Sequence, residues 1–364
     1  MRFPEFSGEW ERCKVKDFTK VVAGATPSTS NKEYWGGDIR WMNSGELNLK
    51  RVYEVQGRIT QLGYEKTSTK IIPPQSVLIG LAGQGKTRGT AAINYVELCT
   101  NQSIASILPS DKYYPEFLYQ NIESRYKELR DISSGDGGRG GLNLQMIYNL
   151  NIPYCSISEQ RKIGDFLCLL DQRIETQRKI IEKYESLIRG LCEKLTRQGA
   201  TNKTIAECLE CHSSTLQESA VLDAGSYPVY GAIGICGYTD TPDVSGDGIL
   251  IIKDGASVGV TYFADGSYSS IGTLNRLTAK EDINLRYIYY CLKVLNFTPY
   301  KTGLAIPHIY FKDYGKHKIW CPSLEQQSSI ADALTTIDNK IQVEKSLLEQ
   351  LNSQKRYMLN QLFI

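Results

Sequence analysis

The stretch from Gly80 to Thr87 has the residue types and spacing of a nucleotide-phosphate site. It reads GLAGQGKT, which fits the P-loop pattern G-x-x-x-x-G-K-[ST], and it follows the apolar run Val77–Ile79. In that motif the backbone amides hold the phosphates, a lysine (here Lys86) reaches the terminal ones, and a helix begins directly afterwards. The next residues, RGTAAINYV, are typical of a turn and a strand. We therefore expect a strand–turn–strand, and a P-loop enzyme that binds nucleoside triphosphates is the alternative function.

Two shorter motifs suggest other chemistry. Cys208–His212 reads CLECH, the C-x-x-C-H pattern of haem attachment or half of a zinc site. Asn151–Tyr154 reads NIPY, one residue from the N-P-P-Y signature of adenine methyltransferases. The first lacks a second ligand pair nearby, and the second lacks the glycine-rich cofactor loop of a doubly wound domain. We expect buried thiols and an extended segment, with no catalytic residues and no metal site in the chain.

The elements that position these residues are organised by a repeat. Ile157–Leu195 and Leu324–Leu362 align without a gap at an offset of 167 residues. In both, apolar residues recur in alternating steps of four and three, the heptad seam of helices packed along their length. Each predicted helix is on the order of 58 Å long at ~1.5 Å per residue. We expect an antiparallel, coiled-coil-like pair, and two ordinary core helices are the alternative. The predicted packing residues are Leu167, Leu170, Ile174, Ile181, Ile188, Leu334, Ile337, Ile341, Leu348 and Leu351.

The segments before the two helices also correspond. Gly248–Ile252 matches the predicted strand at Val77–Ile79, and Leu285–Tyr289 matches the start of a predicted helix at Pro115–Leu129. The predicted fold class is α+β, with two similar α/β domains separated by two long antiparallel helices and related by a pseudo-twofold axis. The predicted boundaries are a first domain at 1–155, a first helix at 156–198, a second domain at 199–322 and a second helix at 323–364.

Charge and composition limit the function classes only weakly. The chain has 364 residues, a net charge of +2 and ten cysteines. Residues 1–155 carry a net charge of +3 and residues 199–322 carry −2, so bulk charge does not indicate a nucleic-acid ligand. Met1–Lys20 has no signal-peptide core, and no apolar run is long enough to span a membrane. We therefore expect a cytoplasmic protein with reduced thiols and no membrane association.

Seven short motifs, in their order and duplication, resemble the specificity (S) subunit of type I restriction–modification systems. The resemblance covers essentially the whole chain. The motifs are GATPST (24–29), YWGGDIRW (34–41), IPPQSVLIG (72–80) and IPYCSISEQRKI (152–163), then SYPVYGAIGICGY (226–238), GILIIKDGASVG (248–259) and CPSLEQQSSIADAL (321–334).

The resemblance implies a DNA-recognition subunit without catalytic activity of its own. Two target-recognition domains would each read one half of a bipartite site in double-stranded DNA, and the two helices would set the gap. The subunit would bind two methyltransferase (M) subunits, which use S-adenosylmethionine, and restriction (R) subunits, which use ATP and Mg²⁺. No cofactor would bind to this chain itself.

Base recognition requires polar side chains on loops, with Arg or Lys directed at guanine and Asn or Gln at adenine. Glycine-rich loops also let the backbone approach phosphates closely. The predicted DNA-binding residues in the first domain are Lys32, Arg40, Asn43, Ser44, Gln84, Lys86, Arg88 and Arg139. Those in the second domain are Ser214, Tyr230, Lys253, Ser257, Lys301 and His308. Each of them could equally be a solvated surface residue.

Overall fold

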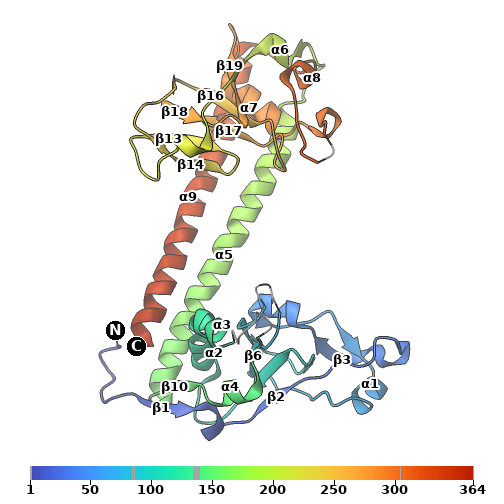
Figure 1. The fold of residues 1–364 in the computed structure, drawn as a ribbon, viewed down its shortest axis with the longest axis vertical. Helices are drawn as coiled ribbons and strands as arrows, with labels where there is room; N and C mark the ends of the chain where they lie inside the picture. The colour runs from blue at the N-terminus through green and yellow to red at the C-terminus, as the bar shows by residue number, and fades with distance from the viewer. Residues whose placement is uncertain (1, 84, 86, 134–139, 304, 364) are drawn as a thin grey trace. The chain divides into compact units, whose positions relative to one another are not determined.

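The computed structural model describes residues 2–83, 85, 87–133, 140–303 and 305–363. The chain divides into two compact units, one of residues 1–176 and 348–364 and the other of residues 177–347. Two helices of 39 residues, α5 (Ile157–Leu195) and α9 (Leu324–Leu362), contribute to both units (Figure 1). These bounds confirm the two helices predicted from the heptad pattern. No described helix is both long and apolar enough to cross a membrane.

The first unit contains a central sheet between a helical layer and a smaller sheet. The central sheet has the order β2 (Val21–Ala23), β9 (Ile104–Ile107), β6 (Val77–Gly80), β7 (Ala91–Asn94) and β4 (Arg51–Val52). The smaller sheet has the order β5 (Arg58–Ile59), β3 (Trp35–Met42) and β8 (Cys99–Thr100), and β1 (Glu11–Lys14) pairs with β10 (Asn151–Tyr154). Side chains alternate along β6, so Val77 and Ile79 face the helices while Leu78 faces the other core.

Three short helices, α2 (Pro115–Ser124), α3 (Tyr126–Ile132) and α4 (Leu144–Tyr148), cover one face of the central sheet. A fourth, α1 (Gln61–Glu65), packs beside β3 of the smaller sheet. The unit also has 3₁₀ turns at Val15–Asp17, Lys32–Tyr34 and Ser44–Leu49. The single helix predicted at Pro115–Leu129 is wrong, because the chain breaks between α2 and α3 at Arg125. There φ is −92° and ψ is 17°, and the guanidinium donates to Glu128 and to the carbonyl of Asn151.

The second unit repeats this plan. Its central sheet has the order β12 (Leu209–Ser213), β19 (Leu274–Ala279), β16 (Gly248–Ile252) and β17 (Thr261–Ala264). Its second sheet has the order β14 (Gly234–Thr239), β13 (Tyr227–Gly231), β18 (Ser267–Ser270) and β15 (Val244–Ser245), and β11 (Lys203–Thr204) pairs with β20 (Lys318–Ile319). The helices are α6 (Ile205–Cys208), α7 (Leu285–Lys293) and α8 (Phe311–Tyr314), with 3₁₀ turns at Glu218–Ala220 and Thr298–Tyr300.

The correspondence extends to the direction of single side chains. Ile249 and Ile251 of β16 face the core under α7, and Leu250 faces the opposite core, as Leu78 does in the first unit. Both units therefore place one apolar strand at the centre, buried on both faces. The duplication seen in the sequence is a duplication of the fold.

The two long helices run antiparallel within each unit. In the first unit Lys355 of α9 pairs with Asp171 of α5 at 2.6 Å. In the second unit Lys345 of α9 pairs with Glu185 of α5 at 2.7 Å. Seven of the ten predicted packing residues are buried, and the other three are partly exposed. The buried ones are Leu167, Ile174, Ile181, Ile188, Leu334, Ile341 and Leu351, and the partly exposed ones are Leu170, Ile337 and Leu348.

Candidate nucleic-acid interface

Four of the predicted DNA-binding residues lie along β3 and just beyond its two ends. Lys32 is exposed in the 3₁₀ turn before the strand, and Ser44 begins the turn after it. The guanidinium Nε of Arg40 lies 2.9 Å from Glu54 Oε1 and, as the main cause, lowers the pKa of Glu54 to about 2. Asn43 caps the following turn through its side-chain oxygen. Arg40 must therefore break its ion pair with Glu54 before it can bind DNA. Asn43 already has a structural role as a cap.

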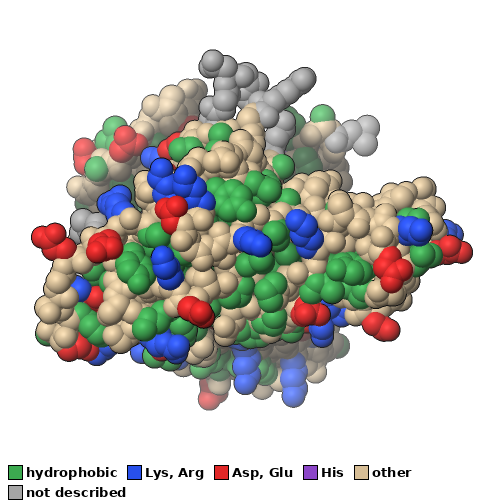
Figure 2. All heavy atoms as spheres, turned by 90° about the horizontal axis from the view of Figure 1, so that it is seen from below, with side chains coloured by type: hydrophobic (Ala, Val, Ile, Leu, Met, Phe, Trp, Pro, Cys, Tyr) green, Lys and Arg blue, Asp and Glu red, His purple; other side chains and the backbone are tan. Residues whose placement is uncertain are grey.

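The remaining predictions in the first domain fall on the loop after β6 and on the segment before α4. Gln84, Lys86 and Arg139 lie outside the described residues. Arg88 donates through Nη1 to the carbonyl of Gly140. This bond joins the two segments, so Arg88 holds the loop as well as offering a cation. The face drawn in Figure 2 carries acidic and basic side chains interspersed, without a broad field of one sign among the described residues.

Three of the six residues predicted in the second domain, Lys253, Ser257 and His308, lie where β16 ends. Lys301 lies on a neighbouring segment of the same chain. The amide after His308 donates to the carbonyl of Lys253 at 3.0 Å, and Ser257 lies exposed in the loop that follows Asp254. His308 Nδ1 lies 2.7 Å from Asp254 Oδ1. Because Asp254 accepts the Nδ1 proton, Nε2 of the imidazole remains available to a ligand.

The other two predictions in this domain lie elsewhere. Tyr230 packs edge-on against Tyr268 with ring centroids 5.7 Å apart, and burial raises the pKa of Tyr230. Ser214 lines a separate polar cavity of about 300 Å³ together with Arg276 and His212. Sequence reasoning did not select these two basic residues. The feature that could have indicated them is their position within strand-like runs of the sequence. A basic residue is unusual there unless it faces solvent or a ligand.

The loop from Gly80 to Thr87 does not have the surroundings of a P-loop. It connects β6 to β7, which pair antiparallel with Ile79 opposite Ala91. Among the described residues between these strands, no helix begins. The helix N-terminus that would hold the phosphates is therefore missing, and the strand–turn–strand prediction is confirmed.

The C-x-x-C-H motif is spread over two elements. Cys208 ends α6, fully buried, and its thiol shares a hydrogen bond with Cys321, which raises the pKa of Cys208 and lowers that of Cys321 to about 7. His212 lies on β12, with Nε2 at 2.9 Å from Thr278 Oγ1. The cysteines are free thiols, and the described part of the chain holds no cluster of three or more residues able to bind a metal ion.

A buried ionic network attaches the first domain to the long helices. Asp171 of α5 accepts from Arg51 at 3.0 Å and from Lys355 at 2.6 Å. Lys355 also lies 2.9 Å from Glu123 of α2, and Arg51 lies 2.8 Å from Glu116. Burial opposes ionisation of Glu123, yet its cationic neighbours hold its pKa below the ordinary value. Each charge in this network is matched, as buried charges require.

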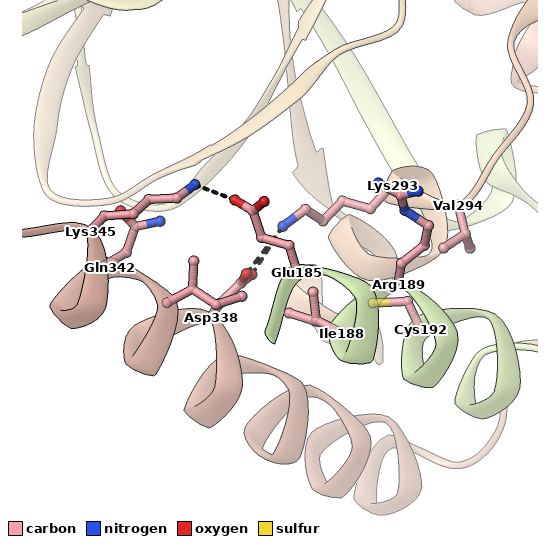
Figure 3. Close-up of a pocket in the computed structure, with 10 residues that line it drawn as sticks. Glu185, Ile188, Arg189, Cys192, Lys293, Val294, Asp338, Gln342 and Lys345 are labelled. Carbon is pink, nitrogen blue, oxygen red and sulfur yellow. Dashed lines mark hydrogen bonds and ion pairs between the residues drawn. The ribbon is translucent and has the colours of Figure 1, made fainter. Parts of the chain in front are cut away.

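The second unit makes the equivalent attachment with a different cation. Lys293 of α7 lies 3.1 Å from Asp338 of α9, and Asp338 corresponds to Asp171 at the 167-residue offset. Figure 3 shows this pair beside the Lys345–Glu185 pair, around a cavity of about 420 Å³. The domain–helix contact is thus conserved between the halves, while its charges are arranged differently.

One polar pair interrupts the apolar seam. Gln177 of α5 donates through Nε2 to Glu344 Oε2 at 2.5 Å and to the Glu344 carbonyl at 3.1 Å. The two residues are equivalent at the 167-residue offset, so one position of the repeat pairs with its own copy across the two helices. Lys340 also pairs with Glu344 at 2.7 Å and is the main cause of its lowered pKa.

Comparison with known proteins agrees with this architecture. The family model described as "Type I restriction modification DNA specificity domain" matches residues 7–185 and 200–353. The MjaIX specificity subunit of Methanocaldococcus jannaschii is 35% identical over 183 residues, which cover 48% of this chain and 41% of that protein. The putative MjaX specificity subunit of the same organism is 21% identical over 98% of this chain and 93% of its own length.

A structural neighbour is similar over the full length. The S subunit of a type I restriction–modification system from M. genitalium aligns with a TM-score of 0.71 and 19% identity, covering 98% of this chain and 96% of that one. This likeness concerns the fold. The alignments with MjaIX and with the EcoR124I/EcoR124II specificity subunit of Escherichia coli span less than half of those relatives. Because the family model covers most of the chain in two successive copies, the chain belongs to the type I restriction–modification DNA specificity domain family.

Proposed function

We propose that this chain is the sequence-specific DNA-binding subunit of a type I restriction–modification complex and has no catalytic activity of its own. The observation that supports this most directly is the duplication of one domain plan, each copy continuous with a 39-residue helix. Two similar domains, each continuous with a long helix, suit a target made of two half-sequences separated by a fixed gap. A P-loop enzyme is not favoured, because no helix begins among the described residues between β6 and β7.

In this proposal residues 1–155 and 199–322 are the two target-recognition domains. The clusters around β3 in the first and around His308 in the second are the proposed base-reading surfaces. S-adenosylmethionine would bind to two methyltransferase subunits, and ATP with Mg²⁺ to the restriction subunits. The relatives' names as specificity subunits support this division of labour.

Sequencing the modified bases of a host that expresses this chain with its methyltransferase subunit tests the proposal. The expected product is methylation at a bipartite site. Lys32→Gln should alter or relax one half-sequence and His308→Gln the other, while Lys316→Gln, at an exposed position away from both clusters, should alter neither. Methylation at a continuous site, or changes in both halves from one substitution, would contradict the proposal.

Assembly can be tested separately. Ile174 and Ile341 are 5% and 3% exposed in the helix seam. Changing both to Asp would place charges in an apolar environment, which costs several kcal/mol for each unpaired group. The double variant should fail to form a complex with two methyltransferase subunits in native mass spectrometry. A fully assembled complex would show that the seam does not support docking.

A further inference from the structure

The polar cavity of the second unit has an unusual position within the fold. It opens between the end of β12, the end of β18 and the middle of β19, and its volume is about 300 Å³. His212 and Arg276 are cross-strand partners on β12 and β19. The cavity is therefore built on the central sheet and is not formed by loops alone.

The residues at the equivalent strand positions of the first unit are of different types. There Val22 of β2 pairs with Ser106 of β9, and Val22 packs against an apolar core. In both units the next strand contributes a leucine, Leu78 or Leu250, at the matching position. A valine and a serine in one copy thus correspond to a histidine and an arginine in the other, within the domain whose net charge is −2.

The space above these strands differs in the same way. In the first unit Gly24 lies so close to Thr100 that a Cβ atom built on it would be 1.8 Å from the Thr100 carbonyl oxygen, and the backbone fills the site. The corresponding residues of the second unit are Ser214 and Ser270, and both line the open cavity. Ser214 therefore adds a hydroxyl group where the first unit has a glycine packed against the backbone, and Ser270 keeps the hydroxyl of Thr100.

The lining groups have capacity to donate hydrogen bonds. Ser270 is only 4% exposed, and its hydroxyl has no hydrogen-bond partner among the described residues. Ser214 Oγ accepts from the amide of Leu216 at 3.2 Å, which leaves its proton for a ligand. No acidic side chain of the described chain lies within ion-pair distance of Arg276, although Asp243 lines the same cavity. A half-buried cation beside one buried and one half-buried hydroxyl donor favours an anionic ligand.

We propose that this cavity binds one phosphate group of the DNA backbone, with Arg276 supplying the charge and Ser214 and Ser270 supplying hydrogen bonds. The inference rests on the proposed DNA-binding function and locates a phosphate contact within the acidic second domain. A phosphodiester carries a single negative charge, so Arg276 can bind it despite the nearby carboxylate of Asp243. Asp243 then weakens the contact by repulsion.

Salt dependence of DNA binding by the assembled complex tests the proposal. Each neutralised phosphate contributes about 0.9 to the slope of log affinity against log salt concentration. Arg276→Gln should lower the slope by about 0.9 and weaken binding roughly tenfold at low salt, because a charged hydrogen bond is lost. Arg276→Lys should keep the slope, and Asp243→Asn should tighten binding. Lys316→Gln, which removes one exposed charge elsewhere, is the matched control and should leave the slope unchanged.

Several outcomes would overturn the inference. An unchanged slope for Arg276→Gln, in a wild-type complex that does bind DNA, refutes the phosphate contact alone. If the wild-type complex binds no DNA, the proposed function fails with it. A changed base in the modified sequence would show that Arg276 reads a base. Thermal stabilisation by inorganic phosphate in the wild type but not in Arg276→Gln, without a change in slope, would assign the cavity to a free anion. Weaker binding by Asp243→Asn would contradict the assigned sign and remains measurable if Arg276→Gln does not fold.

Discussion

The buried network around Lys355 allows a charge-relocation experiment. At the 167-residue offset Lys355 corresponds to Ile188, and at the 170-residue offset Glu123 corresponds to Lys293. The second unit therefore uses the cation on its short helix, while the first unit uses the cation on α9. Lys355→Ile combined with Glu123→Lys would give the first unit the arrangement that the second unit already has.

The expected magnitudes follow from burial. The side chain of Lys355 is 14% exposed and that of Glu123 is 19% exposed, so removing one partner leaves a charge largely shielded from water. Breaking a buried pair in this way costs about 3–5 kcal/mol. Lys50, 3.3 Å from Glu123, remains in place, so we expect about 3 kcal/mol for Lys355→Ile. The unfolding midpoint of the first unit should fall by roughly 6–12 °C.

The double variant should recover most of this loss. Glu123→Lys alone brings the introduced amine close to Lys355 and should also destabilise the unit, whereas in the double variant that amine can pair with Asp171. A double-mutant cycle should give a coupling free energy of at least ~2 kcal/mol, measured by chemical denaturation. Lys162→Ile, at an exposed pair with Glu5, is the control and should cost less than ~1 kcal/mol. If the losses in the free energy of unfolding of the two single variants simply add in the double variant, Lys355 and Glu123 are not coupled and the charge-relocation argument is refuted.

Acid titration supplies an independent readout of the same site. The cations near Glu123 hold its pKa below the ordinary value despite burial. Its carboxylate therefore stabilises the fold above the unfolded-state pKa of about 4.3, and that contribution disappears as the pH falls through the folded-state value. The double variant lacks this carboxylate, so its stability should depend less steeply on pH below about 4. If the stability of the wild type and that of the double variant fell equally steeply below about pH 4, the argument would be contradicted.

Two further predictions concern the helix pair. Gln177→Glu would place a second carboxylate beside Glu344, so we expect a lower unfolding temperature at pH 7 and a smaller decrease near pH 4. An equal decrease at both pH values would contradict this prediction. Inserting four residues after Ile181 and four after Leu348 lengthens each helix by about 6 Å, close to two base pairs of DNA. Methylated sites should then keep both half-sequences with a gap one or two base pairs longer, and an unchanged gap in an assembled complex would mean that the helices do not set the spacing.

The long helices were predictable because their signal is both local and extended. Apolar residues at alternating steps of four and three over 39 residues allow little freedom in register or bounds. The repeated strands were also predictable, because a short apolar run followed by glycines occurs at the same place in both halves. The break at Arg125 was not predictable, since it depends on a backbone angle and on a contact with Asn151, 26 residues along the chain.

The candidate DNA-reading residues show where sequence reasoning ends. Asn43 has the chemistry to read adenine, but the same amide chemistry caps a helical turn, and only the structure separates the two uses. Arg276 was not selected, because nothing in the sequence distinguishes a cation in a cavity from one on an outer strand face. Its significance emerges from the register comparison with Ser106, which requires both sheets to be known.

The differences in charge between the two halves also favour pairing of α5 with α9 over pairing of two identical helices. Two first halves paired through their copies of α5 would set Glu123 and Asp171 opposite Ile188 in place of Lys355, so that only Lys50 and Arg51 would remain as their cations. Two second halves paired through α9 would set one Glu344 against the other at the pseudo-twofold axis. Both alternatives remove one partner from a buried carboxylate, although Lys50, Arg51 and Lys340 remain, and the loss of such a partner destabilises the pairing. The observed pairing of α5 with α9 matches the carboxylates of this network with cations and Gln177 with Glu344, so duplication followed by charge relocation favours association of unlike halves.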